Sequence, residues 1–144
     1  MDVSELRKRI LRALDDARKD ATGRRTVVDE SSKAYQTFLA NTAVPLLKQA
    51  ASVLNAANYA FVVHTPAESV RLVAEKSPDT YLEIDLDLNR PEPAVMGRVS
   101  LTRGRQGLIV EEREIAPGTA VAKLTEEDVS AFLIEEIPKL VAKP

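Results

Sequence analysis

The stretch Leu82-Glu83-Ile84-Asp85-Leu86-Asp87-Leu88 decides the fold class of this chain, because aliphatic and acidic residues alternate through all of it. Successive side chains on a β-strand point to opposite faces, so the alternation predicts a strand with one dry face and one wet face. Strands of this kind are typical of an antiparallel sheet that is covered on one side only.

The same period of two continues on both sides of this strand. We expect five strands, over residues 59–64, 69–75, 80–88, 94–103 and 108–115. Turn-forming residues separate them, and each connection is too short for a crossover helix, so the strands should form an antiparallel meander. Gly97, inside the fourth strand, predicts a bulge or a close approach. The residues expected to face inward are Val70, Leu72, Leu82, Ile84, Leu86, Leu88, Val95, Val99, Leu101, Leu108 and Val110.

Helical periodicity precedes the sheet. A narrow apolar stripe recurs at spacings of three and four residues, at Val3, Leu6, Ile10, Leu14 and Ala17. It predicts an amphipathic helix, which we expect to end at Gly23. A second helical stretch begins near Val28 and ends near Asn58. Because proline lacks a backbone N–H and crowds the preceding turn, Pro45 predicts a kink or restart within it.

A last helix follows the sheet, over residues 125–141. Thr125 with the acids behind it is an N-terminal capping signature, and acids are favoured at the positive end of the helix dipole. Pro138 predicts the end of this helix or a bend in it. Its apolar face is expected to hold Val129, Phe132, Leu133 and Ile137.

Together these patterns predict an α+β fold with two N-terminal helices, a five-stranded antiparallel meander and a C-terminal helix packed on one face. We expect the 144 residues to form one domain, divided into a helical part (1–58), the sheet (59–115) and the last helix (125–141). The helices should cover the apolar face of the sheet, since an exposed apolar face must be buried against another layer.

Composition excludes several classes of protein. The net charge of −2 argues against a protein that coats nucleic acid. With no cysteine and one histidine, we expect no disulfide, no cofactor and no metal site. The charged first residues lack the apolar core of a secretory signal, and the least polar stretch, residues 43–63, is interrupted by polar side chains. We therefore expect a cytoplasmic protein with no membrane partner.

Four arginines surround the last predicted hairpin and form the first candidate site: Arg98, Arg103, Arg105 and Arg113. An anion or an acidic partner could dock there. Gly104 and Gly107 have the Gly-x-x-Gly spacing of a nucleic-acid clamp, but that clamp joins two helices, whereas strands flank this one. A hairpin turn accounts for both glycines.

His64 and Tyr35 are the second candidate pair. His64 ends the first strand, and Tyr35 lies on the early apolar face of the second helix. No nucleophile elbow or catalytic set accompanies the histidine, so we expect a turn or capping role for it. If a cavity opens between the sheet and the kinked helix, these two side chains are the polar groups that would line it.

The absence of catalytic motifs favours a non-catalytic binding or interaction module over an enzyme. We expect it to associate with itself as a homodimer, because strand 59–64 is an uncharged edge that a second copy could pair with. A small-ligand binder or enzyme with a cavity under the sheet is the alternative, with an unidentified protein or small molecule as partner. Nucleic-acid binding through the arginine hairpin is a weaker alternative, since the chain is acidic overall.

Overall fold

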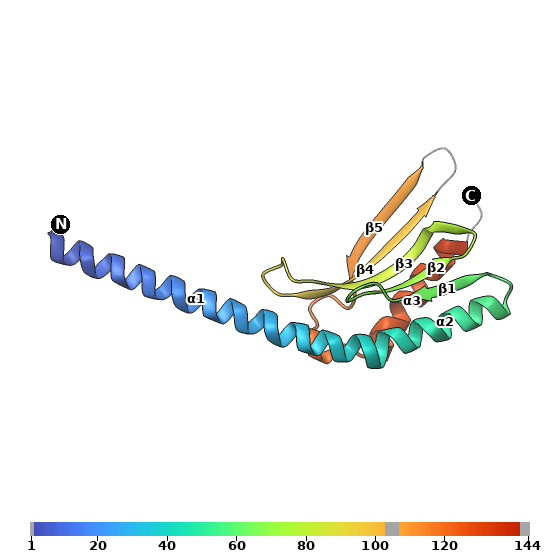
Figure 1. The fold of residues 1–144 in the computed structure, drawn as a ribbon, viewed down its shortest axis with the longest axis horizontal. Coiled ribbons are helices and arrows are strands. Elements are labelled where there is room, and N and C mark those ends of the chain that lie inside the picture. Colours follow the sequence, from blue (N-terminus) through green and yellow to red (C-terminus); the bar gives the residue numbers. More distant parts are fainter. Residues whose placement is uncertain (1, 103–106, 142–144) are drawn as a thin grey trace.

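The computed structural model describes residues 2–102 and 107–141 and has an α+β architecture (Figure 1). The N-terminal helical region comes first, the five strands follow, and one helix ends the described chain. In order the elements are α1 (Val3–Phe38), a π-helical turn η1 (Leu39–Ala43), α2 (Val44–Ala56), β1 (Phe61–His64), β2 (Val70–Ala74), β3 (Ser77–Asp87), β4 (Ala94–Thr102), β5 (Leu108–Glu114), a 3₁₀ turn η3 (Val121–Lys123) and α3 (Glu126–Val141).

The five strands form one antiparallel sheet in the order β1-β2-β3-β4-β5, which confirms the predicted meander. Ile84 at its centre lies opposite Val70 on β2 and Gly97 on β4. Residues that are paired across an antiparallel ladder share a face, so this register puts the aliphatic residues of the central strands on one side of the sheet. β1 and β5 are the two edges.

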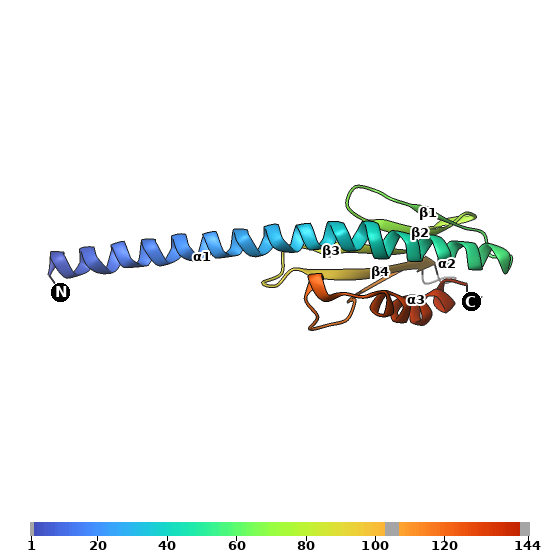
Figure 2. The ribbon, with the colours of Figure 1, turned by 90° about the horizontal axis from the view of Figure 1, so that it is seen from below.

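Helices cover that apolar side alone. The C-terminal end of α1, α2 and α3 pack against it, as the two perpendicular views show (Figure 2). The fully buried side chains come from both layers, so the core lies between sheet and helices: Val70, Leu72, Leu82 and Ile84 from the strands, and Leu47, Val129 and Phe132 from the helices.

The boundary between the two N-terminal helices differs from the prediction. α1 runs through Gly23 without interruption, because a single glycine costs only about 1 kcal/mol relative to alanine, which a long helix can absorb. The division lies instead at η1, directly before Pro45. There Val44 donates to the carbonyl of Leu39, five residues back, and this wider turn makes room for the proline ring.

The capping of α3 agrees with the prediction, but its proline does not end it. The backbone N–H of Thr125 donates to Asp128 Oδ2 over 2.9 Å, and the Thr125 hydroxyl accepts from the Asp128 N–H. Pro138 lies inside the helix, which continues to Val141. Among the helices of residues 2–102 and 107–141, none has the length and apolarity needed to cross a bilayer.

The inward set of β5 was predicted wrongly. Leu108 and Val110 are 57% and 51% exposed, whereas the other predicted inward positions are buried, except Leu86 and Leu88, which are half-buried. The register explains this: Val110 is paired with Ser100, so both lie on the outer face. The three consecutive apolar residues 108–110 are compatible with either face. In the observed register, Glu111 and Arg113 of β5 face α3 and form ion pairs with it.

Gly97 marks a close approach, one of the two roles predicted for it. A Cβ atom at this position would lie 2.3 Å from Cζ of Phe132, well inside van der Waals contact. The phenyl ring of α3 therefore rests directly on the backbone of β4, and it is 2% exposed. Only glycine lets the helix lie this close to the sheet.

We predict that Gly97→Ala destabilises the protein by about 1–3 kcal/mol, because the added methyl group overpacks a tightly filled core. Denaturant unfolding measures the loss. In the double variant Gly97→Ala/Phe132→Leu the ring atoms that clash are gone, so the added loss from the alanine should be smaller than in the wild-type background. Equal losses from the alanine in both backgrounds would contradict the contact.

Candidate functional site

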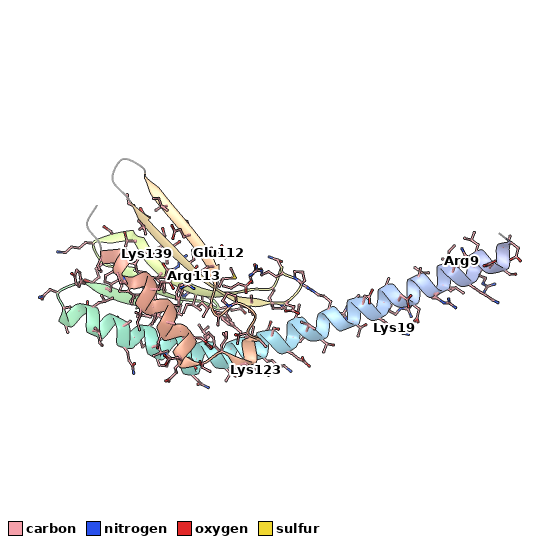
Figure 3. The ribbon with its side chains drawn as sticks, turned by 180° about the vertical axis from the view of Figure 1, so that it is seen from behind. Arg9, Lys19, Glu112, Arg113, Lys123 and Lys139 are labelled. Atoms are coloured by element: carbon pink, nitrogen blue, oxygen red, sulfur yellow. The ribbon has the colours of Figure 1, made fainter. Side chains whose placement is uncertain are left out.

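The first part of α1 projects away from the rest of the protein, and we call residues 3–23 the free segment (Figure 1). Every residue from 2 to 27 is exposed. Within the part of the chain that the structure describes, the side-chain hydrogen bonds and ion pairs of the free segment all stay inside the helix, as in Arg9–Glu5 and Lys19–Asp15. Figure 3 shows Arg9 and Lys19 far from the sheet. The predicted packing of this helix on the sheet is therefore wrong.

The free segment carries the predicted apolar stripe on one face, and the stripe is open to solvent. Val3 is 83% exposed, and Leu6, Ile10 and Leu14 are 48%, 50% and 57% exposed. Ala17 and Ala21 continue the same spacing of three and four residues. Such a row on a single helix face is the pattern by which amphipathic helices bind a groove or another helix.

The stripe continues the face with which α1 packs on the body. Counting on by threes and fours from Ala21, the face passes through Arg24 and the half-buried Val28 to Tyr35, which is 2% exposed. At Arg24 the guanidinium donates to the carbonyl oxygens of Leu88 (3.0 Å), Arg90 (2.6 Å) and Pro91 (2.7 Å) in the β3–β4 connection. This cluster fixes the direction in which the helix leaves the body.

The four arginines predicted as one site do not form one. Arg98 lies on the outer face of the sheet, whereas Arg113 is paired with Gly97 and lies on the helix-covered face. Arg113, which lies beside α3 in Figure 3, donates to Glu136 and Glu135 of that helix over 3.1 Å each and stacks on the Phe132 ring. Arg113 therefore has its hydrogen-bond partners within the protein, and so does Arg98, which donates to Glu83. Arg103 and Arg105 lie outside the described residues.

The outer face of the sheet holds a second charged cluster, centred on Glu83. Its carboxylate accepts from Arg71 on β2, from Arg98 on β4 over 2.8 Å and from the Ser69 hydroxyl over 3.3 Å. The expectation of a solvated carboxylate is wrong, because the two arginine side chains cover Glu83 and leave it 4% exposed.

Tyr35 and His64 are not brought together. Tyr35 is buried, and its hydroxyl donates to the carbonyl oxygen of Glu68 over 2.7 Å. Burial raises the pKa of its phenol well above the ordinary value, and the nearby acids Asp85, Glu68 and Glu83 add to the shift. His64 is exposed at the end of β1, opposite Arg71.

A shallow cleft of about 230 Å³ lies beside Tyr35, between α1 and the end of β3 that extends past β2. Its polar lining comes from all three surrounding segments and comprises Ser32, Tyr35, Gln36, Glu68, Ser69 and Asp85. Burial raises the pKa of the Asp85 carboxyl, a shift that Arg98 opposes. Ligand pockets commonly enclose roughly 300–1,000 Å³, so this cleft is small for one.

Within residues 2–102 and 107–141, no three His, Asp or Glu side chains are placed to hold a metal ion. Comparison of the chain with known protein families, with curated proteins and with solved structures finds no match.

Sequence reasoning found the apolar stripe but not its exposure. The signal that could have revealed it is the composition of the stripe, which ends in Ala17 and Ala21 and includes few large side chains for a helix that covers a sheet. A break at Gly23 would have allowed the helix to fold back onto the body. The continuous helix instead carries the stripe away from it.

We predict that Glu83→Ala lowers the free energy of unfolding by about 1–3 kcal/mol, because both arginines lose a charged acceptor in a covered position. Asp85→Ala, two residues along the same strand face, is the matched control and should change it by less than about 0.5 kcal/mol. Urea unfolding at neutral pH measures both. Equal losses in the two variants would contradict the central place of Glu83.

Proposed function

We propose that this protein is a non-catalytic interaction module whose docking surface is the apolar stripe of the free segment. The observation that carries the proposal is the exposure of Val3, Leu6, Ile10 and Leu14 in one row on a helix that the body holds at its other end. Single exposed apolar residues are ordinary on protein surfaces, but a contiguous row marks a binding surface.

The helix itself gives a second reason for a partner. Every residue of the free segment is exposed, so it lacks the tertiary packing that stabilises most helices, and Gly23 and the aspartates in its middle lower its helix propensity. Burial of the stripe against another surface would supply the tertiary packing from which most helices in proteins gain their stability. Binding and helix stability are thus coupled in this proposal.

The other two functions considered have less support. A small-ligand site beside Tyr35 would use a cleft of about 230 Å³ or a neighbouring hollow of about 480 Å³ that is lined mainly by apolar side chains, and the Tyr35 hydroxyl between them already donates to Glu68. Nucleic-acid binding would need free cations in one patch, whereas Arg98 and Arg113 lie on opposite faces, each among acids.

A photo-crosslinking experiment tests the proposal. A photoreactive amino acid replaces Ile10 in the stripe, and a matched variant carries it at Lys19, on the opposite face of the same helix. In extracts of the source cells we predict discrete crosslinked species from position 10 and none above background from position 19. Equal labelling from both positions, or none from position 10, would contradict a docking surface on the stripe.

A further inference from the structure

We propose that the occupant of the stripe is a second copy of this chain, whose free segment packs antiparallel on the first one. This inference rests on the proposed function, because it names the partner of the same surface. Three features of the described residues support it: the position of the body relative to the stripe, the order of large and small residues along the stripe, and the distribution of charge.

The position of the body excludes a parallel, in-register partner helix. From Arg24 onward, the β3–β4 connection, η3 and the sheet lie on one side of α1 (Figures 1 and 2), and Arg24, which continues the stripe, contacts that connection. A parallel partner helix would run into this space, since it must follow the stripe along its whole length. An antiparallel partner places its own body away from this space, beyond Asp2 and past the other end of the helix pair.

Large and small side chains are segregated along the stripe in the order that antiparallel packing requires. The first half holds Val3, Leu6 and Ile10, and the second half holds Leu14 near the middle, followed by Ala17 and Ala21. With the two-fold axis near Arg12, Val3 meets the partner's Ala21 and Leu6 meets the partner's Ala17. Pairing large with small side chains keeps the distance between two helices even along their length.

In a parallel pair, identical residues face each other. Two leucines would then meet in one layer and two alanines in another, and the helices would have to converge from one end to the other. The middle layer of the antiparallel pair brings Ile10 against the partner's Leu14. This pair occurs twice, once on each side of the axis, and forms the centre of the interface.

The charges of the free segment divide in the same way. Residues 2–12 hold four cations and two anions, whereas residues 13–23 hold three anions and two cations. Antiparallel packing sets the basic half of each helix against the acidic half of the other. Along one flank of the stripe, Arg9 lies opposite the partner's Asp16, and opposite charges at such positions favour a defined register.

The other flank provides a diagnostic contact. There Arg7 lies opposite the partner's Arg18, so two like charges face each other on each side of the axis. Like-charge contacts weaken association, and removing one should strengthen it. Each free segment is about 31 Å long, so the interface is of modest size and we expect a dissociation constant in the micromolar range.

Sedimentation velocity between about 1 and 200 μM brackets that expected constant and tests the dimer. The wild type should shift from monomer to dimer as concentration rises. Ile10→Asp should weaken association at least about 10-fold, because both copies lose the central layer. Lys8→Gln changes the charge by the same amount on the opposite face and should leave association unchanged, whereas Arg18→Glu should tighten it.

Disulfide trapping tests whether the two helices pack antiparallel. Because the chain contains no cysteine, only the introduced residues can form a disulfide. A mixture of the single variants Leu6→Cys and Ala17→Cys should form mainly the mixed disulfide under mild oxidation. A mixture of Lys8→Cys and Lys19→Cys, both on the opposite face, should form none above background. Circular dichroism and thermal unfolding confirm that each variant keeps the folded body, which does not use these side chains.

Several outcomes would overturn the proposal. A wild type that stays monomeric at every concentration would do so, as would a predominance of disulfides between two copies of the same variant, which indicate a parallel pair. Dissociation by Val62→Lys with no effect of Ile10→Asp would place the contact at the β1 edge instead. If position 10 crosslinks a different protein while the wild type is monomeric, the docking surface stands and only its occupant is wrong.

Discussion

The hydrogen bonds from Arg24 to three carbonyl oxygens of the β3–β4 connection are the contact on which the arrangement of this protein depends. α1 is longer than the body can cover. These hydrogen bonds hold it to the β3–β4 connection at the point where the helix leaves the body. Because α1 is unbroken at Gly23, the direction fixed there extends to Val3. The apolar stripe is thereby held in solvent, facing the same side as the buried half of the helix.

Much of the fold could be predicted from the sequence because its central strands alternate cleanly. Leu82 and Ile84 with their acidic neighbours define both faces of β3, and the short connections impose the meander. The errors occurred where a pattern is locally ambiguous. Residues 108–110 are apolar on both faces, so only pairing with β4 and the contacts with α3 decide their side. Glu83 was expected in solvent because alternation says nothing about the arginines that cover it.

The candidate site was less accessible to sequence reasoning. Periodicity identified the stripe, yet whether Leu6 and Ile10 pack on their own sheet depends on the path of the chain at Gly23 and Pro45. Because the helix is uninterrupted at Gly23 and the division lies at the π-helical turn before Pro45, the free segment extends away from the body and does not pack on it. The arginines near the last hairpin were close in sequence, but alternation along β4 and β5 separates Arg98 from Arg113 across the sheet.

Hydrogen exchange measured at several protein concentrations tests the central claim most directly, namely that the free segment of α1 is a docking element for a second copy. The account predicts that amides between residues 7 and 22 gain protection as concentration rises, while those of β3 and β4 are protected equally throughout. Protection of the free segment that is independent of concentration, whether high or low, would contradict it.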